Sequence, residues 1–182
     1  MTTHLVWLRN DLRVNDNTAL YAACRDTQAN VIALFIATPA QWQQHDMASR
    51  QAAFIYDNLQ LVQQELAGRG IPLHYSQCDD FAASVEQLSE FCQQHQVDRL
   101  FYNYQYEVNE RQRDAAVEKV LFGQDIIVQG FNDSLLLPPG SVQTGNNEMY
   151  KVFTPFSKAF VKRLQQGLPE CVPAPQAREG AP

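Results

Sequence analysis

Five short apolar runs alternate with helical patterns, and this alternation strongly limits the folds open to the chain. The runs are residues 4–8, 30–36, 71–75, 98–102 and 125–129. Each has the length of a buried strand, and the stretches between them carry apolar residues at spacings of three and four, as amphipathic helices do. Repeated strand–helix units are typical of an α/β fold with a doubly wound parallel sheet and helices on both faces. We expect five strands in the Rossmann-like order 3-2-1-4-5.

Capping residues and glycines suggest where the helices begin and end. The first helix can be capped by Asp16 or Asn17, and the third strand, which begins near Pro72, suits a sheet edge. Asp79 and Asp80 are the predicted caps of another helix. The first predicted helix ends near Cys24, and the second covers residues 49–66. The third runs from after Asp80 to Phe91, and the fourth runs from after Arg111 to Leu121. Residues 38–47 are expected to form a loop.

The regular pattern stops after Gly130, which suggests a second part of the chain. Residues 156–164 read as one further helix with lysines and an arginine on one side. Residues 169–182 are rich in proline and resemble an unanchored linker. We therefore predict an α/β domain at 1–131 and an interdomain connector at 132–182.

Composition excludes several classes of protein. No apolar run reaches the length of a membrane span, and no signal sequence is evident, so a cytoplasmic protein, expected to be monomeric, is the simplest interpretation. Four scattered cysteines and four histidines lack the spacing of a metal site, so no metal is predicted. The net charge of −6 argues against a nucleic-acid clamp, because phosphate binding requires a basic surface.

The carboxyl ends of the first and fourth strands form the predicted ligand site. In the expected order these strands are neighbours, which places Arg9–Asp11 beside Tyr102–Glu110. The carboxylate of Glu110 could accept hydrogen bonds from a ring edge with adjacent N–H and NH2 groups. The tyrosines and Trp42 could stack on such a ring or simply pack in the core.

Other polar residues in this region leave alternatives open. Arg9, Asp11, Arg13 and Asp16 alternate in sign, which favours an internal salt-bridge network that fixes the loop. Neither of the two common glycine-rich phosphate cradles is present. No specific set of catalytic residues can be assembled, so catalytic residues are predicted to be absent from this chain.

Four separated segments resemble the photolyase/cryptochrome family. Residues 7–20 are similar to its W-[FL]-R-x-D-L-R-x-x-D-N-x-A-L opening. Residues 101–111, 137–140 and 150–156 are similar to further landmarks of the bacterial class I cyclobutane pyrimidine dimer photolyases. The resemblance covers essentially the whole chain.

The resemblance implies a light-harvesting role for this chain. The α/β domain of such proteins helps to bind an antenna chromophore, 5,10-methenyltetrahydrofolate, and the positions that match its contacts are Asn109, Glu110 and His45. A helical C-terminal domain, expected to be absent from this chain, holds FAD and the flipped-out dimer of UV-damaged DNA. Reduced FAD then donates an electron that splits the dimer.

Four alternatives remain open at this stage. A cryptochrome-type blue-light photoreceptor belongs to the same family, and its distinguishing residues would lie outside the chain. A generic nucleotide-binding α/β module would bind ATP or AMP rather than folate. A domain that only braces the flavin domain would carry no chromophore. In the last alternative, a different antenna such as a deazaflavin or FMN would occupy the same crevice.

Overall fold

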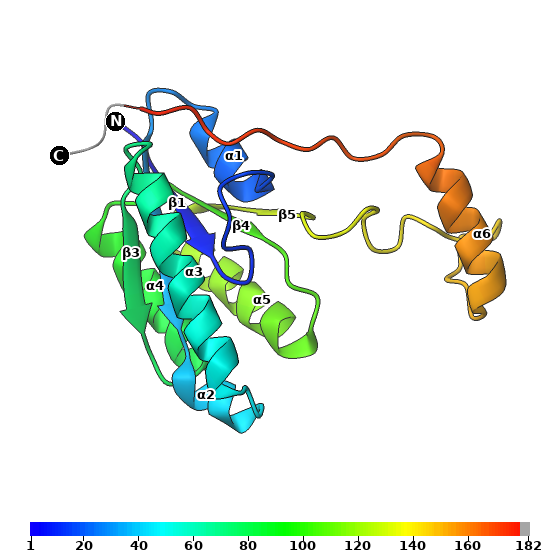
Figure 1. The fold of residues 1–182 in the computed structure, drawn as a ribbon, viewed down its shortest axis with the longest axis horizontal. Coiled ribbons are helices and arrows are strands. Elements are labelled where there is room, and N and C mark those ends of the chain that lie inside the picture. Colours follow the sequence, from blue (N-terminus) through cyan, green and yellow to red (C-terminus); the bar gives the residue numbers. More distant parts are fainter. Residues whose placement is uncertain (179–182) are drawn as a thin grey trace. The chain divides into compact units, whose positions relative to one another are not determined.

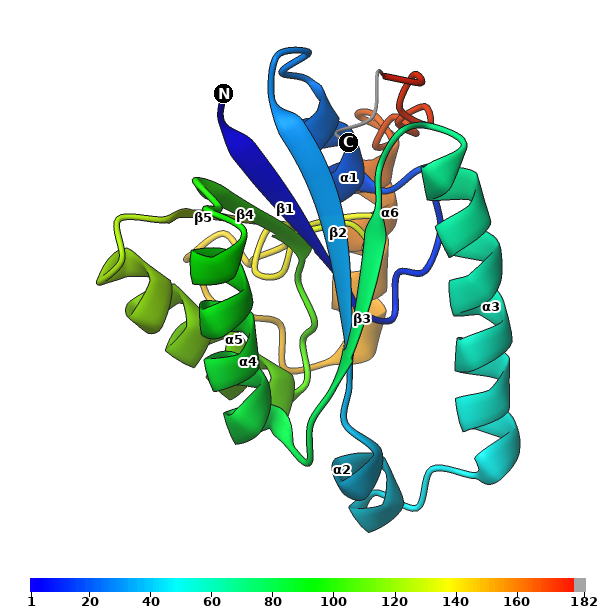
Figure 2. The same cartoon turned by 90° about the vertical axis from the view of Figure 1, so that its left-hand side faces the viewer.

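A computed structural model describes residues 1–178 of the protein and divides them into two compact units. One unit contains Met1–Asp133 together with the residues from Val172, and the other contains Ser134–Cys171. Figures 1 and 2 show the layers of the larger unit, in which helices cover both faces of a central sheet.

The sheet has five parallel strands in the order β3-β2-β1-β4-β5. The strands are β1 (Thr3–Leu8), β2 (Asn30–Ala37), β3 (Leu73–Gln77), β4 (Arg99–Asn103) and β5 (Ile127–Phe131). β1 lies at the centre and is almost wholly buried, since both its neighbours and helices on both faces cover it. The predicted fold class and strand order are confirmed.

Helices pack on the sheet through the apolar residues that define their periodicity. The helices of the larger unit are α1 (Thr18–Cys24), α2 (Pro39–Gln44), α3 (Ser49–Ala67), α4 (Phe81–Gln94) and α5 (Val108–Phe122). α1 and α3 cover one face of the sheet, and α4 and α5 cover the other (Figure 2). No helix within residues 1–178 combines the length and apolar character needed to cross a bilayer.

Local capping chemistry places two helix starts where the sequence predicts them. The side chain of Asn17 accepts from the backbone N–H of Leu20 at 3.1 Å, and that of Asp80 accepts from Ala83 N–H at 2.8 Å. The predicted loop after β2 is wrong in one respect, because α2 forms there. Pro39 stands at the first turn of α2, where its fixed backbone angle suits a helix.

Two strands begin two residues later than their apolar runs suggest. Asp125 adopts a positive φ of 61°, and Ile126 N–H bonds to Leu121 O, so these residues close α5 instead of starting β5. Ile71 likewise bonds to Leu66 O at the end of α3, and Pro72 has no N–H to give to the sheet. Apolar residues that follow a helix can therefore belong to its termination.

The smaller unit contains one helix, α6 (Phe153–Leu164), in agreement with the single helix predicted there. The ring of Phe156 contacts those of Tyr150, Phe153 and Phe160, with ring centroids 5.7–6.5 Å apart. Lys162 and Arg163 lie in its last turn, where positive charge interacts favourably with the helix dipole.

Residues 172–178 are tied to the larger unit, so the prediction of an unanchored linker is wrong for this stretch. Val172 and Asp16 exchange two hydrogen bonds of 3.0 Å. The guanidinium of Arg178 donates to the carbonyls of Ala29 and Cys24 at 2.8 and 2.9 Å. Residues 179–182 of the predicted linker lie outside the described residues.

Candidate functional site

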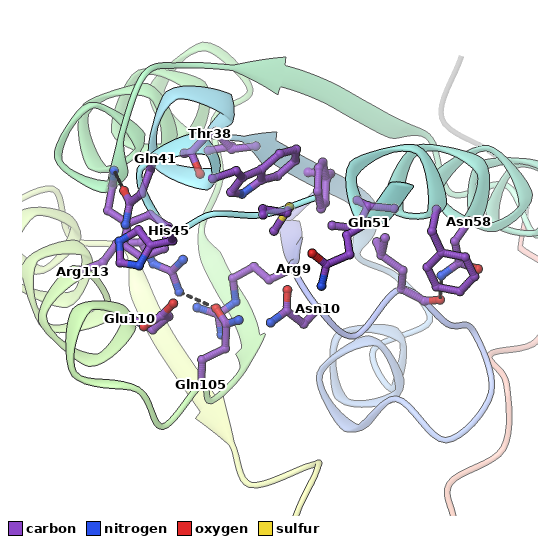
Figure 3. A pocket seen from close by; sticks show the side chains of 18 of the residues that line it. Arg9, Asn10, Thr38, Gln41, His45, Gln51, Asn58, Gln105, Glu110 and Arg113 are labelled. Carbon is purple, nitrogen blue, oxygen red and sulfur yellow. Dashed lines mark hydrogen bonds between the residues drawn. The ribbon is translucent and has the colours of Figure 1, made fainter. Parts of the chain in front are cut away.

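A cleft of about 630 Å³ opens at the carboxyl ends of the central strands. The floor of the cleft is formed by residues that follow different strands, because parallel strands all end at the same edge of a sheet. Arg9 directly follows β1, Thr38 directly follows β2, and β4 leads to Gln105 and to Glu110 in the first turn of α5. All four residues line the cleft. Figure 3 shows these side chains pointing into it.

One wall of the cleft is apolar and partly aromatic. This wall comprises Phe35, Ile36, Trp42, Met47, Phe54 and Ile55. Most of these residues belong to the end of β2, to α2 and to the first turns of α3. A wall of this kind suits a flat conjugated ring, which can be covered by aromatic and thioether groups.

The predicted site residues are only partly brought together. His45 and Glu110 line the same cleft, and so does Trp42, whereas exposed Asn109 is not part of the lining. His45 is the C-cap of α2, and Glu110 stands in the first turn of α5. The cleft therefore contains the carboxylate and the imidazole that the sequence singles out.

The three tyrosines at the end of β4 and just after it, Tyr102, Tyr104 and Tyr106, do not line the cleft. Tyr102 is fully buried and donates through its hydroxyl to Glu118 at 2.6 Å. The ring of Tyr104 packs over Gly130, and Tyr106 donates to the side chain of Asn132 at 2.9 Å. Packing, not stacking on a ligand, is therefore the observed role of these rings.

A buried ion cluster forms the floor of the cleft. Asp114 Oδ1 accepts from Arg9 Nη1 at 2.7 Å and from Arg113 Nη2 and Nε at 2.7 and 3.0 Å. These three side chains are only 5–6% exposed. Arg9 also donates to the backbone carbonyl of Asn103. Two cations thus share one carboxylate at a place that water barely reaches.

Aromatic rings hold both guanidinium groups in place. Arg113 lies 4.6 Å from the ring centroids of Trp7 and of Phe81, and Arg9 lies 4.7 Å from those of Trp7 and Tyr102. Burial, followed by the charge of Arg9, lowers the pKa of Arg113. The group still carries its charge near neutral pH, because the pKa of a guanidinium begins so high. Stacking and ion pairing together fix its orientation.

The expected meeting of the β1 and β4 ends is confirmed. The amide of Asn103 donates to Asp11 Oδ2 at 2.6 Å and to Asn17 Oδ1 at 2.9 Å, and its oxygen accepts from Ala19 N–H at 3.0 Å. One buried side chain at the end of β4 thereby orders the loop between β1 and α1.

The expected salt-bridge network within this loop is wrong in its pairing. Arg9 pairs with Asp114, and Arg13 pairs with Asp133 at 2.5 Å. Asp11 accepts from the backbone N–H of Arg9 and from Asn103, not from an arginine side chain. The loop charges are therefore neutralised by residues far along the chain.

Sequence reasoning missed several residues that line the cleft, above all Arg113 and Gln105. A signal for Arg113 was available, because a residue three positions after Glu110 lies on the same face of a helix. Gln105, Gln51 and Asn58 carry no comparable signal. Within residues 1–178, no group of three or more His, Cys, Asp or Glu side chains is placed to hold a metal ion.

The comparisons with known proteins show the family. A family sequence model described as DNA photolyase matches residues 4–176. This chain belongs to the DNA photolyase family. The match spans both compact units, so the family assignment includes the residues around α6 as well as the sheet.

Several relatives that match this chain are described as deoxyribodipyrimidine photo-lyases. The protein from Salmonella typhimurium is 61% identical over 178 residues, and that from Escherichia coli K12 is 57% identical over 178 residues. In both cases the match covers 98% of this chain and 37% of the relative, so the chain spans little more than a third of their length.

Solved structures confirm the fold. A cryptochrome from Synechocystis superposes with a TM-score of 0.84 at 22% identity, and covers 98% of this chain and 37% of its own. An archaeal photolyase from Sulfolobus tokodaii superposes with a TM-score of 0.75 at 25% identity over 99% of this chain and 38% of its own. The latter is described with two FAD molecules and a novel light-harvesting cofactor.

Proposed function

We propose that the cleft binds a light-harvesting chromophore of the methenyltetrahydrofolate class within a deoxyribodipyrimidine photo-lyase. The observation that carries the proposal is the position of Glu110, whose carboxylate lines a cleft with an aromatic and apolar wall in a chain of the DNA photolyase family. A pterin edge offers adjacent N–H and NH2 donors, which a carboxylate can accept together.

The residues present fit this chromophore. His45 and Glu110 supply polar contacts, Trp42 and its apolar neighbours cover the ring, and a 630 Å³ cleft lies within the range of small-molecule sites. When bound, the folate would absorb near-UV light and pass the excitation to a flavin. Asn109 is exposed, so its proposed contact would be with a peripheral part of the ligand.

The whole protein is proposed to repair cyclobutane pyrimidine dimers in DNA by electron transfer from reduced FAD. Relatives 57–61% identical over this chain support a photolyase over a cryptochrome-type photoreceptor. Contacts with FAD and UV-damaged DNA are not assigned to residues of this chain, whose net charge is −6. A cytoplasmic, monomeric protein belongs to the same proposal.

The test is the near-UV absorption spectrum of the full-length protein, purified in the dark, with and without Glu110→Ala. We expect a folate band in the wild type that the variant loses, while flavin absorption and directly flavin-driven dimer repair persist. Arg111→Ala, on the exposed side of the same helical turn, serves as the control and should keep the band. An unchanged spectrum in Glu110→Ala would exclude this residue as an antenna contact.

A further inference from the structure

The start of α5 presents two opposite kinds of hydrogen-bonding group to the cleft. Glu110 and Arg113 are one helical turn apart, and both line the cleft. An ionised carboxylate only accepts hydrogen bonds, whereas a guanidinium only donates them. Figure 3 shows both residues with Gln105 toward the same end of the cleft.

Arg113 is held as a rigid donor. Its guanidinium lies between the rings of Trp7 and Phe81, and its Nε and Nη2 are engaged with Asp114. Nη2 also donates to Gln105 Oε1 at 2.8 Å. Within residues 1–178, the hydrogen bonds of Arg113 all involve Nε and Nη2, so Nη1 can donate to a ligand.

Gln105 adds a second donor because of its bond to Arg113. Its amide oxygen is occupied by the guanidinium, and the side chain lines the cleft. The amide NH2 is therefore the end that remains for a ligand. Arg113 thus supplies one donor itself and orients another.

We propose that Arg113 and Gln105 make the cleft specific for a 2-amino-4-oxo pyrimidine edge, such as that of a pterin. This inference rests on the proposed function, in which Glu110 accepts from the 2-amino group and the neighbouring ring N–H. Arg113 and Gln105 then donate to the 4-oxo oxygen next to them. The two oxygens of Glu110 match the two donors of the ring, and the donors of Arg113 and Gln105 match the lone pairs of the 4-oxo oxygen.

The same arrangement rejects a 2,4-diamino ring. An amino group at position 4 would point its own hydrogens toward the donors of Arg113 and Gln105. Neither the amino group nor these two side chains would then face an acceptor. Unpaired buried donors are expensive, and sites built around a specific hydrogen bond discriminate strongly for that reason. Specificity is the readout that a merely structural arginine would not change.

Folic acid and aminopterin form a pair of probes that differ only on this edge of the ring. Folic acid has an oxo group at position 4 and a hydrogen on N3, whereas neutral aminopterin has an amino group at position 4 and no hydrogen on N3. Their binding to the full-length protein would be measured by equilibrium dialysis under mildly alkaline conditions, where the diamino ring is unprotonated. We expect folic acid to bind tighter by at least about 10- to 100-fold, which is the effect that a single unpaired buried donor would have. Arg113→Met should lower this preference by about 10-fold, and the difference at N3, which faces Glu110, accounts for the preference that remains.

Two further variants guard the test against misfolding. Arg111→Met, which is exposed and outside the lining, should keep the preference. Arg113→Met leaves Asp114 paired with Arg9, so folding should survive, as urea unfolding would show. Gln105→Met removes the second donor outside the ion cluster and should also reduce the preference.

The outcomes separate this inference from the proposed function. Folic acid binding that requires Glu110, together with equal or tighter binding of aminopterin by the wild type, would overturn the inference and leave the proposed function standing. Binding of both probes that does not respond to Glu110→Gln would overturn the proposed function, and the inference with it.

Discussion

Beneath α1 and α3 the sheet buries mainly aliphatic side chains, whereas beneath α4 and α5 it also buries Trp7 and Tyr102 next to two arginines. The difference arises within single strands, because alternate residues of β1 point to opposite faces. Val6 and Leu8 face the aliphatic side, and Leu5 and Trp7 face the other.

The comparison teaches that the two faces of this sheet contribute differently to folding and to the site. Apolar burial stabilises without a directional requirement. Buried charges instead bring a desolvation cost that only well-placed partners offset. The cleft lies at the edge of the sheet where Arg9 and Arg113 are buried. The desolvation cost of these two charges therefore falls at the place where the site has fixed hydrogen-bond donors.

The largest effect is expected from breaking the ion cluster with Asp114→Asn. The change leaves two buried guanidinium groups without their shared carboxylate, and it should lower the free energy of unfolding by about 3–5 kcal/mol. Urea unfolding at neutral pH measures this. A loss below about 1 kcal/mol would show that the charged face tolerates unpaired cations and would remove the contrast with the aliphatic face.

On the aliphatic face, Leu20→Ala should cost somewhat less, about 3 kcal/mol. Leu20 is fully buried in α1, so truncation removes apolar contacts and leaves a cavity. The same urea experiment applies. Ligand binding in the cleft should be unchanged at low denaturant, and a variant that lost binding would show that the two faces are not separable.

A third prediction concerns the close approach of β5 to Tyr104. A Cβ at Gly130 would overlap the Tyr104 ring, so Gly130→Ala must displace that ring and should cost about 2 kcal/mol. Gly145→Ala, which has open space around its Cβ, should be neutral within about 0.5 kcal/mol. Combining Gly130→Ala with Tyr104→Ala should cost less than the sum of the two single changes, and simple additivity would contradict the proposed clash.

The smallest effect is expected from pH at the histidine pair of His74 and His95. Their ring centroids are 4.9 Å apart, and burial, then the charge of His95, lowers the pKa of His74 from its usual 6.5. The folded state therefore binds fewer protons than the unfolded state, so stability is lost as pH falls below about 6.5. Both rings are partly solvated, which keeps the effect small.

Urea midpoints measured between about pH 7.5 and pH 5 would test this dependence. His95→Gln should flatten the acid side of the curve, because it removes the neighbouring charge. A variant curve parallel to that of the wild type would show that His95 does not act on His74.

Much of the fold was determined by local pattern. Strand-length apolar runs and amphipathic helices were sufficient to predict five parallel strands in the observed order, since right-handed crossovers leave few topologies. Asn17 and Asp80 could be predicted as caps because capping acts over three residues. The same topology placed Glu110 near the end of β1.

The partners of the charged residues were decided only by the tertiary structure. Arg9 and Asp114 are 105 positions apart, and Arg13 and Asp133 are 120 apart, so no local period connects them. Arg178 similarly returns to the carbonyl of Cys24, a contact that a proline-rich sequence does not suggest. Apolar burial requires only a face, and a sequence pattern can specify a face. A hydrogen bond or ion pair requires particular atoms at a particular distance, and only the folded chain brings those atoms together.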